Sequence, residues 1–416
     1  MYRICKFGGA SVKDADGVRN LKKILDIHKD EKLIVVISAM EKMTNQLEKV
    51  LNSWYYEPNA LKDNFENVKN FHLTIAKQLE NKEGEIISIL NPILDRLWEI
   101  LEGENSKNYD KDYDNIVSFG EYLSTKLIST YLNLNGYYNE FACAINLIKT
   151  DDTFREGKVD WKATETAIQN FVSEHPSKTI ITQGFIGGTL TEEVTTLGRE
   201  GSDFTAAIFA YCLNAKDVTI WKDVPGLLNA DPKFYPNAVK LEEISYQEAI
   251  ELAYYGATII HPKTIKPLQN KSIPLFVKSF LNPDAKGSVI ADIEPIEKIP
   301  SYIFKTEQIL LSIFPKDFSF IAADNLTKIF SFISKNKLKI NLMQNSAVSF
   351  TICMDNKPNR FANLLKDLQE EFTVKYNLNK KLITIRHYNQ KSIDDIIGNQ
   401  CIILEQKSRS TLQVVL

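Results

Sequence analysis

Residues 2–11, Tyr2-Arg-Ile-Cys-Lys-Phe-Gly-Gly-Ala-Ser11, and residues 33–40, Leu33-Ile-Val-Val-Ile-Ser-Ala-Met40, decide the fold of this chain. The first stretch predicts a strand that ends in a tight turn, and residues 12–28 after it carry apolar side chains at helical spacing. The second belongs to a continuous apolar strand predicted over residues 32–39, typical of a strand buried on both faces of a parallel sheet. Together they predict a strand-loop-helix-strand crossover unit.

The same alternation continues to about residue 280. Further strands are predicted near 141 and at 179–182, 217–221 and 273–280, with helices at 113–134, 161–173, 202–213, 246–254 and 262–269. Residues 44–101 read as a helical subdomain over the sheet, interrupted at Pro58 and Pro92. Repeated alternation of strands and helices predicts an α/β fold, an αβα sandwich with a mainly parallel sheet.

The order of predicted strands and helices changes after a linker at Pro295–Pro300. A β-α-β-β-α-β order follows, with strands at 301–315, 339–345, 347–354 and 373–379 and helices at 321–334 and 359–371, which predicts a ferredoxin-like α+β domain. A second, shortened copy begins with a strand at 382–386 and ends before its second helix. We therefore expect domains at 1–295, 301–380 and 381–416.

Composition excludes several classes of protein. The 416 residues are 44% hydrophobic and 25% charged, as in ordinary globular domains. No apolar run approaches the roughly 20 residues that cross a bilayer, and the first residues lack the build of a signal peptide, so we expect a cytoplasmic protein without membrane contact. The five cysteines and five histidines are dispersed, which predicts neither disulfides nor a protein-bound metal. A net charge of −3 and the absence of a basic, aromatic-interleaved motif disfavour a nucleic-acid partner.

Three polar stretches follow predicted strands, where open α/β sheets bind ligands. Lys6-Phe-Gly-Gly9 could cradle a phosphate with its backbone amides, although a lone glycine pair is more often a tight turn. Gly198-Arg-Glu-Gly-Ser-Asp203 opens a helix, where Asp203 could be a substrate-site residue or merely a charge stabilised by the helix dipole. Residues 221–233 form a turn-rich loop that could equally be plain surface. His261 before Pro262 is better explained as a helix-start residue than as a base.

In this order, the stretches resemble the successive motifs of aspartate kinases of the amino-acid kinase family. The resemblance rests on Lys6-Phe-Gly-Gly-Ala-Ser11, Ser38-Ala-Met40 with Thr44, Ser118-Phe-Gly-Glu121, Gln183-Gly-Phe-Ile-Gly188, Gly198-Arg-Glu-Gly-Ser-Asp203, Lys222-Asp-Val-Pro-Gly226 and Gly256-Ala-Thr-Ile-Ile-His-Pro262. It covers about residues 1–295 and continues into a tail like the family's tandem ACT domains. It implies phosphoryl transfer from Mg-ATP to the β-carboxylate of L-aspartate, the first step toward lysine, threonine and methionine.

The resemblance also implies roles for individual residues. Lys6 and Asp203 would be catalytic, and the substrate aspartate would contact Ser38, Thr44, Glu121, Arg199 and Ser202. The nucleotide would contact Lys6, Gly8, Gly9, Lys222, Asp223, Leu228, Lys233 and Thr258. Mg²⁺ would arrive with ATP rather than in a protein cage, and the ACT-like units would pair the chain into a homodimer.

Some positions depart from the family's pattern. The family usually has threonine at Lys222, tyrosine at Leu228, arginine at Lys233 and lysine at Thr258, and Glu200 is often glycine. We hypothesise that Lys222 replaces the charge missing at Thr258. In the tail, Asn341 and Ala347 stand where lysine-inhibited members carry carboxylates, so we expect weak or absent lysine inhibition by an effector site of this kind.

Two other interpretations remain open. One is a different amino-acid kinase, such as an acetylglutamate, glutamate-5 or uridylate kinase, although the Ser-Phe-Gly-Glu and Gly-Arg-Glu-Gly-Ser-Asp stretches fit aspartate kinase better. The other is a regulatory subunit with a decayed kinase site, which retention of Lys6, Arg199 and Asp203 argues against.

Overall fold

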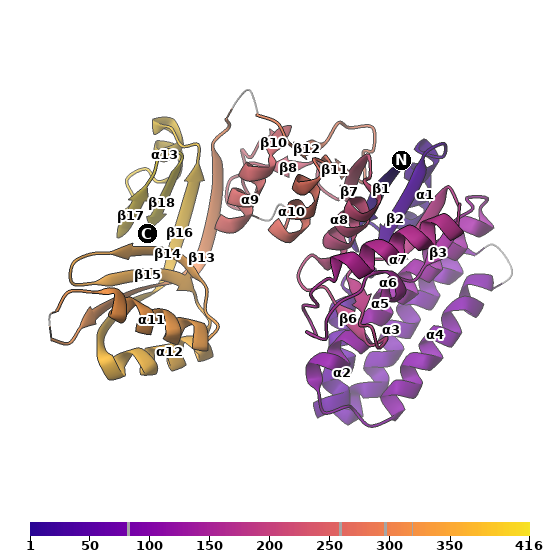
Figure 1. Ribbon diagram of the computed structural model, residues 1–416, viewed down its shortest axis with the longest axis horizontal. Coiled ribbons are helices and arrows are strands. Elements are labelled where there is room, and N and C mark those ends of the chain that lie inside the picture. The colour runs from indigo at the N-terminus through magenta and orange to yellow at the C-terminus, as the bar shows by residue number, and fades with distance from the viewer. Residues whose placement is uncertain (81–83, 258–259, 295–297, 318) are drawn as a thin grey trace. The chain divides into compact units, whose positions relative to one another are not determined.

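The computed structural model describes residues 1–80, 84–257, 260–294, 298–317 and 319–416, which form two compact units (Figure 1). The N-terminal unit comprises residues 1–227, 240–250 and 260–295, and the C-terminal unit comprises 228–239, 251–259 and 296–416. The predicted domain boundaries stay predictions, and the predicted linker at Pro295–Pro300 lies partly outside the described residues. Within the described residues, no helix has the length and apolarity that a membrane span requires.

An eight-stranded sheet organises the N-terminal unit, in the order β10-β12-β11-β7-β1-β2-β4-β3. Its neighbours pair in parallel except β11 and β12, which are antiparallel, so the sheet is mainly parallel as predicted. The strands are β1 (Tyr2–Phe7), β2 (Lys32–Ile37), β3 (Glu140–Ala142), β4 (Thr179–Gln183), β7 (Asp217–Lys222), β10 (Glu243–Ser245), β11 (Leu275–Ser279) and β12 (Ser288–Ala291).

Alternation along β1 and β2 sends side chains to two helical layers. Cys5 and Phe7 join the core beneath the helices that begin the chain, whereas Lys6 points to the opposite face and meets α8 (Gly201–Leu213). The first layer contains α1 (Ala15–Ile27) and α5 (Tyr109–Leu134); the second contains α6 (Ala144–Leu147), α7 (Trp161–Glu174), α8 and α10 (Pro262–Asn270). This is the expected αβα sandwich.

Four short strands that were not predicted complete this part of the chain. They are the hairpin strands β5 (Ile186–Gly188) and β6 (Val194–Thr196) and the two-residue strands β8 (Leu227–Leu228) and β9 (Lys240–Leu241). The helix α9 (Tyr246–Tyr255) was predicted. Helix α1 starts at Ala15 rather than at residue 12, because Asp14 caps it by accepting the backbone N–H of Gly17 at 2.8 Å.

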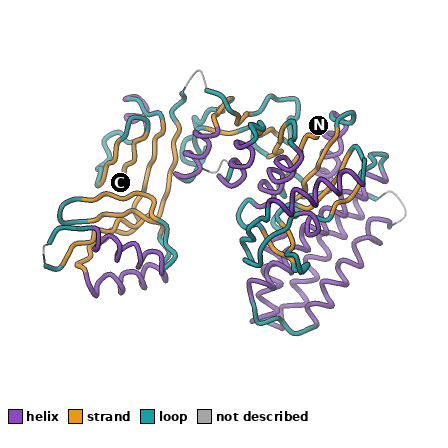
Figure 2. The backbone as a smooth tube through the Cα atoms, in the orientation of Figure 1, coloured by secondary structure: helices purple, strands orange, loops and turns teal. Residues whose placement is uncertain are grey.

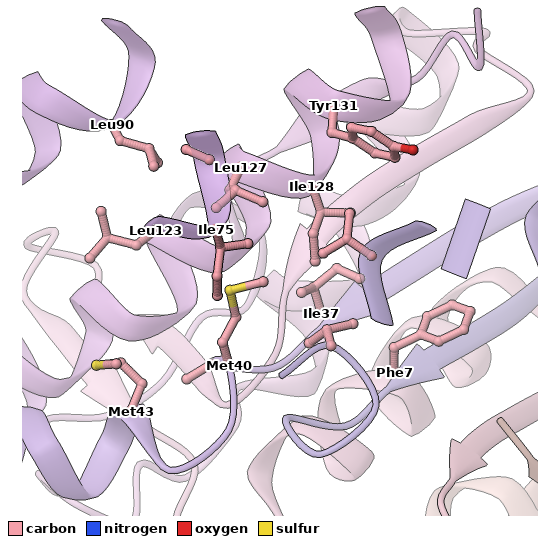
Figure 3. Close-up of a cluster of buried hydrophobic side chains, with 14 of the residues drawn as sticks. Phe7, Ile37, Met40, Met43, Ile75, Leu90, Leu123, Leu127, Ile128 and Tyr131 are labelled. Atoms are coloured by element: carbon pink, nitrogen blue, oxygen red, sulfur yellow. The ribbon is translucent and has the colours of Figure 1, made fainter. Parts of the chain in front are cut away.

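The predicted helical subdomain consists of α2 (Met43–Tyr56), α3 (Pro58–Leu79) and α4 (Glu85–Glu102), packed on α5. Pro58 is the first residue of α3, where its missing backbone N–H breaks no hydrogen bond within the helix. The helices are therefore interrupted at Pro58, as predicted. The break predicted at Pro92 was wrong, because Pro92 lies inside α4. Figure 3 shows Leu123, Leu127 and Ile128 of α5 in one buried cluster with Ile37 and Met40, which anchors these helices to the sheet.

A six-stranded antiparallel sheet organises the C-terminal unit, in the order β14-β15-β13-β16-β18-β17. Its strands are drawn in orange in Figure 2. The elements are β13 (Ser301–Pro315), α11 (Ala323–Lys335), β14 (Ile340–Asn345), β15 (Phe350–Asp355), α12 (Pro358–Glu371), β16 (Phe372–Arg386), α13 (Gln390–Ile396), β17 (Leu404–Lys407) and β18 (Thr411–Val415). The first four strands have the predicted ferredoxin-like arrangement.

The two strands predicted at 373–379 and 382–386 are in fact one. Strand β16 runs through both ranges and pairs along its length with β13, so these two strands serve both ferredoxin-like halves. The second half has only α13 as a helix, and Ala230 and Tyr235 from the segment 228–239 pack on its sheet beside Tyr302.

Candidate active site

The carboxyl ends of the parallel strands meet at one edge of the N-terminal sheet, and the predicted polar stretches meet there too. A cavity of about 560 Å³ opens at this edge. It is lined by Lys6, Gly9, Ser38, Ala39, Glu41, Thr44, Tyr113, Glu121, Arg155, Phe185, Thr196, Gly198, Arg199, Glu200, Gly201, Ser202, Asp203 and Lys222. Its position is the one where open α/β sheets bind ligands.

The turn after β1 brings the backbone of Gly9 close to the backbone of residues 39–41. A Cβ on Gly9 would lie 2.5 Å from the carbonyl oxygen of Ala39 and 2.7 Å from that of Glu41. The carbonyl of Gly9 accepts the backbone N–H of Glu41 at 2.9 Å, which ties the β1 turn to the loop after β2. Only glycine permits this approach, so the turn is a built feature of the cavity wall.

Lys6 and Asp203 form a buried ion pair across the cavity floor. The Lys6 Nζ lies 2.6 Å from Oδ1 of Asp203, and the Lys222 Nζ lies 3.8 Å from Oδ2. Burial alone raises the pKa of Asp203, but the ammonium groups of Lys6 and Lys222 outweigh it and hold the pKa below its ordinary value. Asp203 also stands in the first turn of α8, whose dipole favours a negative charge. The carboxylate is therefore ionised and holds two cations in place.

Glu121 is buried in α5 with one carboxylate oxygen unused. Its Oε1 accepts the backbone N–H of Ala39 at 3.3 Å, whereas Oε2 has no hydrogen-bond partner among the described residues. Burial raises the pKa of Glu121 to about 8. A buried carboxylate that lines a cavity and lacks a partner is suited to receive a cation.

The other predicted substrate residues surround these groups. Ser38 and Thr44 are half-buried, Ser202 is buried, and all three line the cavity. Arg199 is exposed at its rim and makes no ion pair with any described residue. Seven of the predicted catalytic and substrate residues thus share one cavity.

Five of the predicted nucleotide residues lie in the N-terminal unit, namely Lys6, Gly8, Gly9, Lys222 and Asp223. Gly9 and Lys222 line the cavity, Gly8 adjoins the Lys6 ammonium, and Asp223 is exposed just after β7. Leu228 and Lys233 belong to the C-terminal unit, and Thr258 lies outside the described residues.

Several lining residues were not predicted. The guanidinium of Arg155 lies over the ring of Tyr113, 4.1 Å from its centre, and is 3.4 Å from a carboxylate oxygen of Asp110. Glu200 caps α8 in the left-handed backbone region and accepts the backbone N–H of His261 at 2.8 Å. His261 in turn caps α10, as predicted. Only tertiary packing brings Arg155 and Tyr113 here, so no local pattern could reveal them.

No group of three or more potential metal-ligating side chains exists among the described residues. The cavity instead combines the ammonium groups of Lys6 and Lys222, two guanidinium groups, and the buried carboxylates of Asp203 and Glu121. This arrangement can hold an anionic donor beside an acceptor that carries both a carboxylate and an ammonium group.

The sequence of this chain is similar to those of known proteins. Residues 1–279 match the model of the amino acid kinase family. The chain is 30% identical to aspartokinase 2, chloroplastic, of Arabidopsis thaliana, over 97% of this chain and 76% of that protein. It is 29% identical to lysine-sensitive aspartokinase 3 of Escherichia coli, over 85% of this chain and 78% of that protein.

A solved structure has the same fold. Aspartokinase III of E. coli in complex with aspartate and ADP superposes with a TM-score of 0.84 at 24% identity, covering 100% of this chain and 96% of that one. Family model, relatives and fold coincide over most of the chain, and the chain belongs to the amino acid kinase family as one of its aspartokinases.

Proposed function

We propose that the chain is an aspartate kinase that converts ATP and L-aspartate into ADP and 4-phospho-L-aspartate. An oxygen of the β-carboxylate attacks the γ-phosphorus, the bond from that phosphorus to the bridging oxygen breaks, and ADP leaves. The product feeds lysine, threonine and methionine synthesis, as the family implies. The observation that carries the proposal is the shared cavity that holds the Lys6–Asp203 pair, Glu121 and Arg199.

Positioning and charge neutralisation supply most of the catalysis in phosphoryl transfer. Lys6 would neutralise charge on the moving phosphoryl group, with the amides of Gly8 and Gly9 beside it. Asp203 would orient Lys6 and Lys222 through the contacts described above. Because these groups are fixed before substrate binds, little reorganisation is needed at the moment of reaction.

Two charged groups of the acceptor match two charged groups of the cavity. Arg199 would bind a carboxylate in bidentate fashion, and Glu121 would receive the ammonium. Ser38, Thr44 and Ser202 would donate hydrogen bonds to the remaining oxygens. Glutamate, one methylene longer, would misplace its distal carboxylate relative to Lys6.

The nucleotide would approach from the side of Lys222 and Asp223, with Leu228, Lys233 and Thr258 as further contacts by resemblance. Mg²⁺ would be bound by the phosphates of ATP, since Mg²⁺ in kinases is commonly held by substrate phosphates with one or two carboxylates. The E. coli relative was crystallised with aspartate and ADP, which supports the same ligand pair here.

The C-terminal unit would carry the regulatory and assembly functions. Its two ferredoxin-like halves resemble ACT domains, and we propose that their sheets pair two chains into a homodimer. An amino-acid effector is also proposed, because the E. coli relative was crystallised with lysine as well as aspartate. A cytoplasmic location remains a prediction from the sequence.

The test is ADP formation from Mg-ATP with aspartate, glutamate or N-acetylglutamate as the acceptor. We expect turnover with aspartate, and Lys6→Ala should abolish it. The matched control is Lys32→Ala, which should retain activity. Lys32 begins the adjacent strand β2 and lies at the end of the strands away from the cavity, since it pairs with Tyr2. Turnover with another acceptor would favour a different amino-acid kinase, and turnover with none would favour a regulatory subunit.

A further inference from the structure

Asp114 is a buried carboxylate that the proposed reaction does not use. It lies on α5 and is 0% exposed, and it is not among the residues that line the cavity. It precedes Glu121 by seven residues, so the two carboxylates lie on the same side of the helix, two turns apart. A charge so deeply buried needs compensation from its surroundings.

Three short hydrogen bonds supply that compensation. Oδ2 of Asp114 accepts the backbone N–H of Arg155 at 2.8 Å and that of Thr196 at 2.8 Å, while Oδ1 accepts the hydroxyl of Thr196 at 2.7 Å. Burial raises the pKa of Asp114, and the bonds from Thr196 and Arg155 act in the opposite direction. All three partners are donors, which suits an ionised carboxylate.

These bonds fasten two segments at the cavity to α5, namely the loop that contains Arg155 and the end of β6 at Thr196. Arg155 and Thr196 both line the cavity, although they lie 41 and 82 residues from Asp114 in the sequence. The two segments also join each other, because Gly157 donates its N–H to the carbonyl of Thr196 at 2.8 Å. Arg155 adopts φ 66°, a left-handed conformation that a non-glycine residue keeps only when its surroundings hold it.

We propose that Asp114 is a positioning residue that holds Arg155 and Thr196 at the cavity, in register with Glu121 and Arg199. The proposal rests on the function proposed above. Asp114 does not line the cavity; it fixes Thr196, three residues before Arg199, to the helix that carries Glu121. The spacing between the group that binds the acceptor's ammonium and the group that binds its carboxylate therefore depends on Asp114.

The experiment compares steady-state constants for Asp114→Ala, Asp114→Asn and Thr196→Val with those of the wild type. Asp114→Ala should raise the KM for aspartate about tenfold or more, since misplacement of about 1 Å can cost up to about 100-fold. The KM for ATP should stay within about twofold. Asp114→Asn should recover most of the loss, because its amide oxygen can accept both N–H groups and its NH₂ can donate to Thr196. Thr196→Val, which removes one bond, should be intermediate.

Asp112 provides a matched control on the same helix. It is buried and accepts hydrogen bonds from the Tyr55 hydroxyl at 2.6 Å and the Ser106 N–H at 2.9 Å, but none of these groups lines the cavity. Asp112→Ala should reduce stability without changing the KM for aspartate. An equal rise in the KM for aspartate in both alanine variants, or an unchanged KM in Asp114→Ala, would overturn the proposal.

Hydrogen exchange separates failure of this proposal from failure of the proposed function. In Asp114→Ala, or in Thr196→Val should the alanine variant not fold, the amides of residues 153–157 and 195–199 should exchange faster, with residues 104–107 unchanged. Unaltered exchange overturns the positioning role whatever the substrate is. Faster exchange together with a wild type that does not use aspartate supports the role and rejects the substrate.

Discussion

The ionisation of Glu121 should control the affinity for aspartate. Burial raises its pKa to about 8, and its Oε2 has no partner among the described residues. At neutral pH the free protein therefore holds Glu121 mostly protonated, a form that cannot pair with an ammonium group. The carboxylate form, which can, becomes dominant as pH rises through this value.

The size of the effect follows from the fraction that is ionised. With a pKa of about 8, roughly one tenth of Glu121 is ionised at about pH 7 and nine tenths at about pH 9. Apparent affinity scales with the competent fraction, so the KM for aspartate should fall about tenfold over this range. Glu121→Gln removes the charge at nearly constant volume and should raise the KM at high pH by roughly 10- to 100-fold, since a charge-assisted hydrogen bond contributes about 1.5–3 kcal/mol.

The assay is the KM for aspartate across this pH range at saturating Mg-ATP, in the wild type, Glu121→Gln and Glu41→Gln. The wild-type KM should fall with pH, and the Glu121→Gln value should be high and flat. Glu41, an exposed carboxylate at the same cavity, is the control, and its variant should keep the wild-type slope. A flat wild-type profile, or the same slope in Glu121→Gln, refutes the reasoning.

Three further outcomes are expected. Lys222→Ala should raise the KM for ATP because a cation next to Asp203 is lost, and an unchanged KM contradicts its role. Gly9→Ala should lower the free energy of unfolding by about 1–3 kcal/mol and impair turnover, since the new Cβ would lie 2.5 and 2.7 Å from backbone oxygens. A melting temperature and a turnover equal to those of the wild type would contradict this prediction. Lysine should inhibit weakly or not at all, because the Asn341 amide is neutral and already contacts Lys305, Gln308 and Asp355; half-maximal inhibition by sub-millimolar lysine would contradict this.

The features of the fold that follow from local periodicity were predictable. The apolar strand at residues 32–37 and the helix that ends near residue 28 appear almost where their patterns placed them. Pro92 misled because a proline inside a helix can be tolerated when packing outweighs one lost hydrogen bond, and Leu90 and Leu94 on either side are buried. The fusion of residues 372–386 into one strand depends on pairing with β13, which no window of sequence contains.

The residues of the site likewise include some that local motifs predict and others that only the folded structure brings together. Lys6, Arg199 and Asp203 lie in motifs at strand ends or helix starts, where spacing carries information. Asp114 and Arg155 are joined by a hydrogen bond although they lie 41 residues apart, and nothing in either local segment indicates the contact. Long-range contacts of this kind determine the geometry of the cavity wall.

Direct detection of the acyl phosphate tests the central claim. Incubation with Mg-ATP, L-aspartate and hydroxylamine should trap the product as aspartate β-hydroxamate, in amounts equal to the ADP released, and Lys6→Ala should yield neither. ADP release without hydroxamate, or a hydroxamate formed from another acceptor in preference to aspartate, would contradict the assignment of this cavity as an aspartate kinase site.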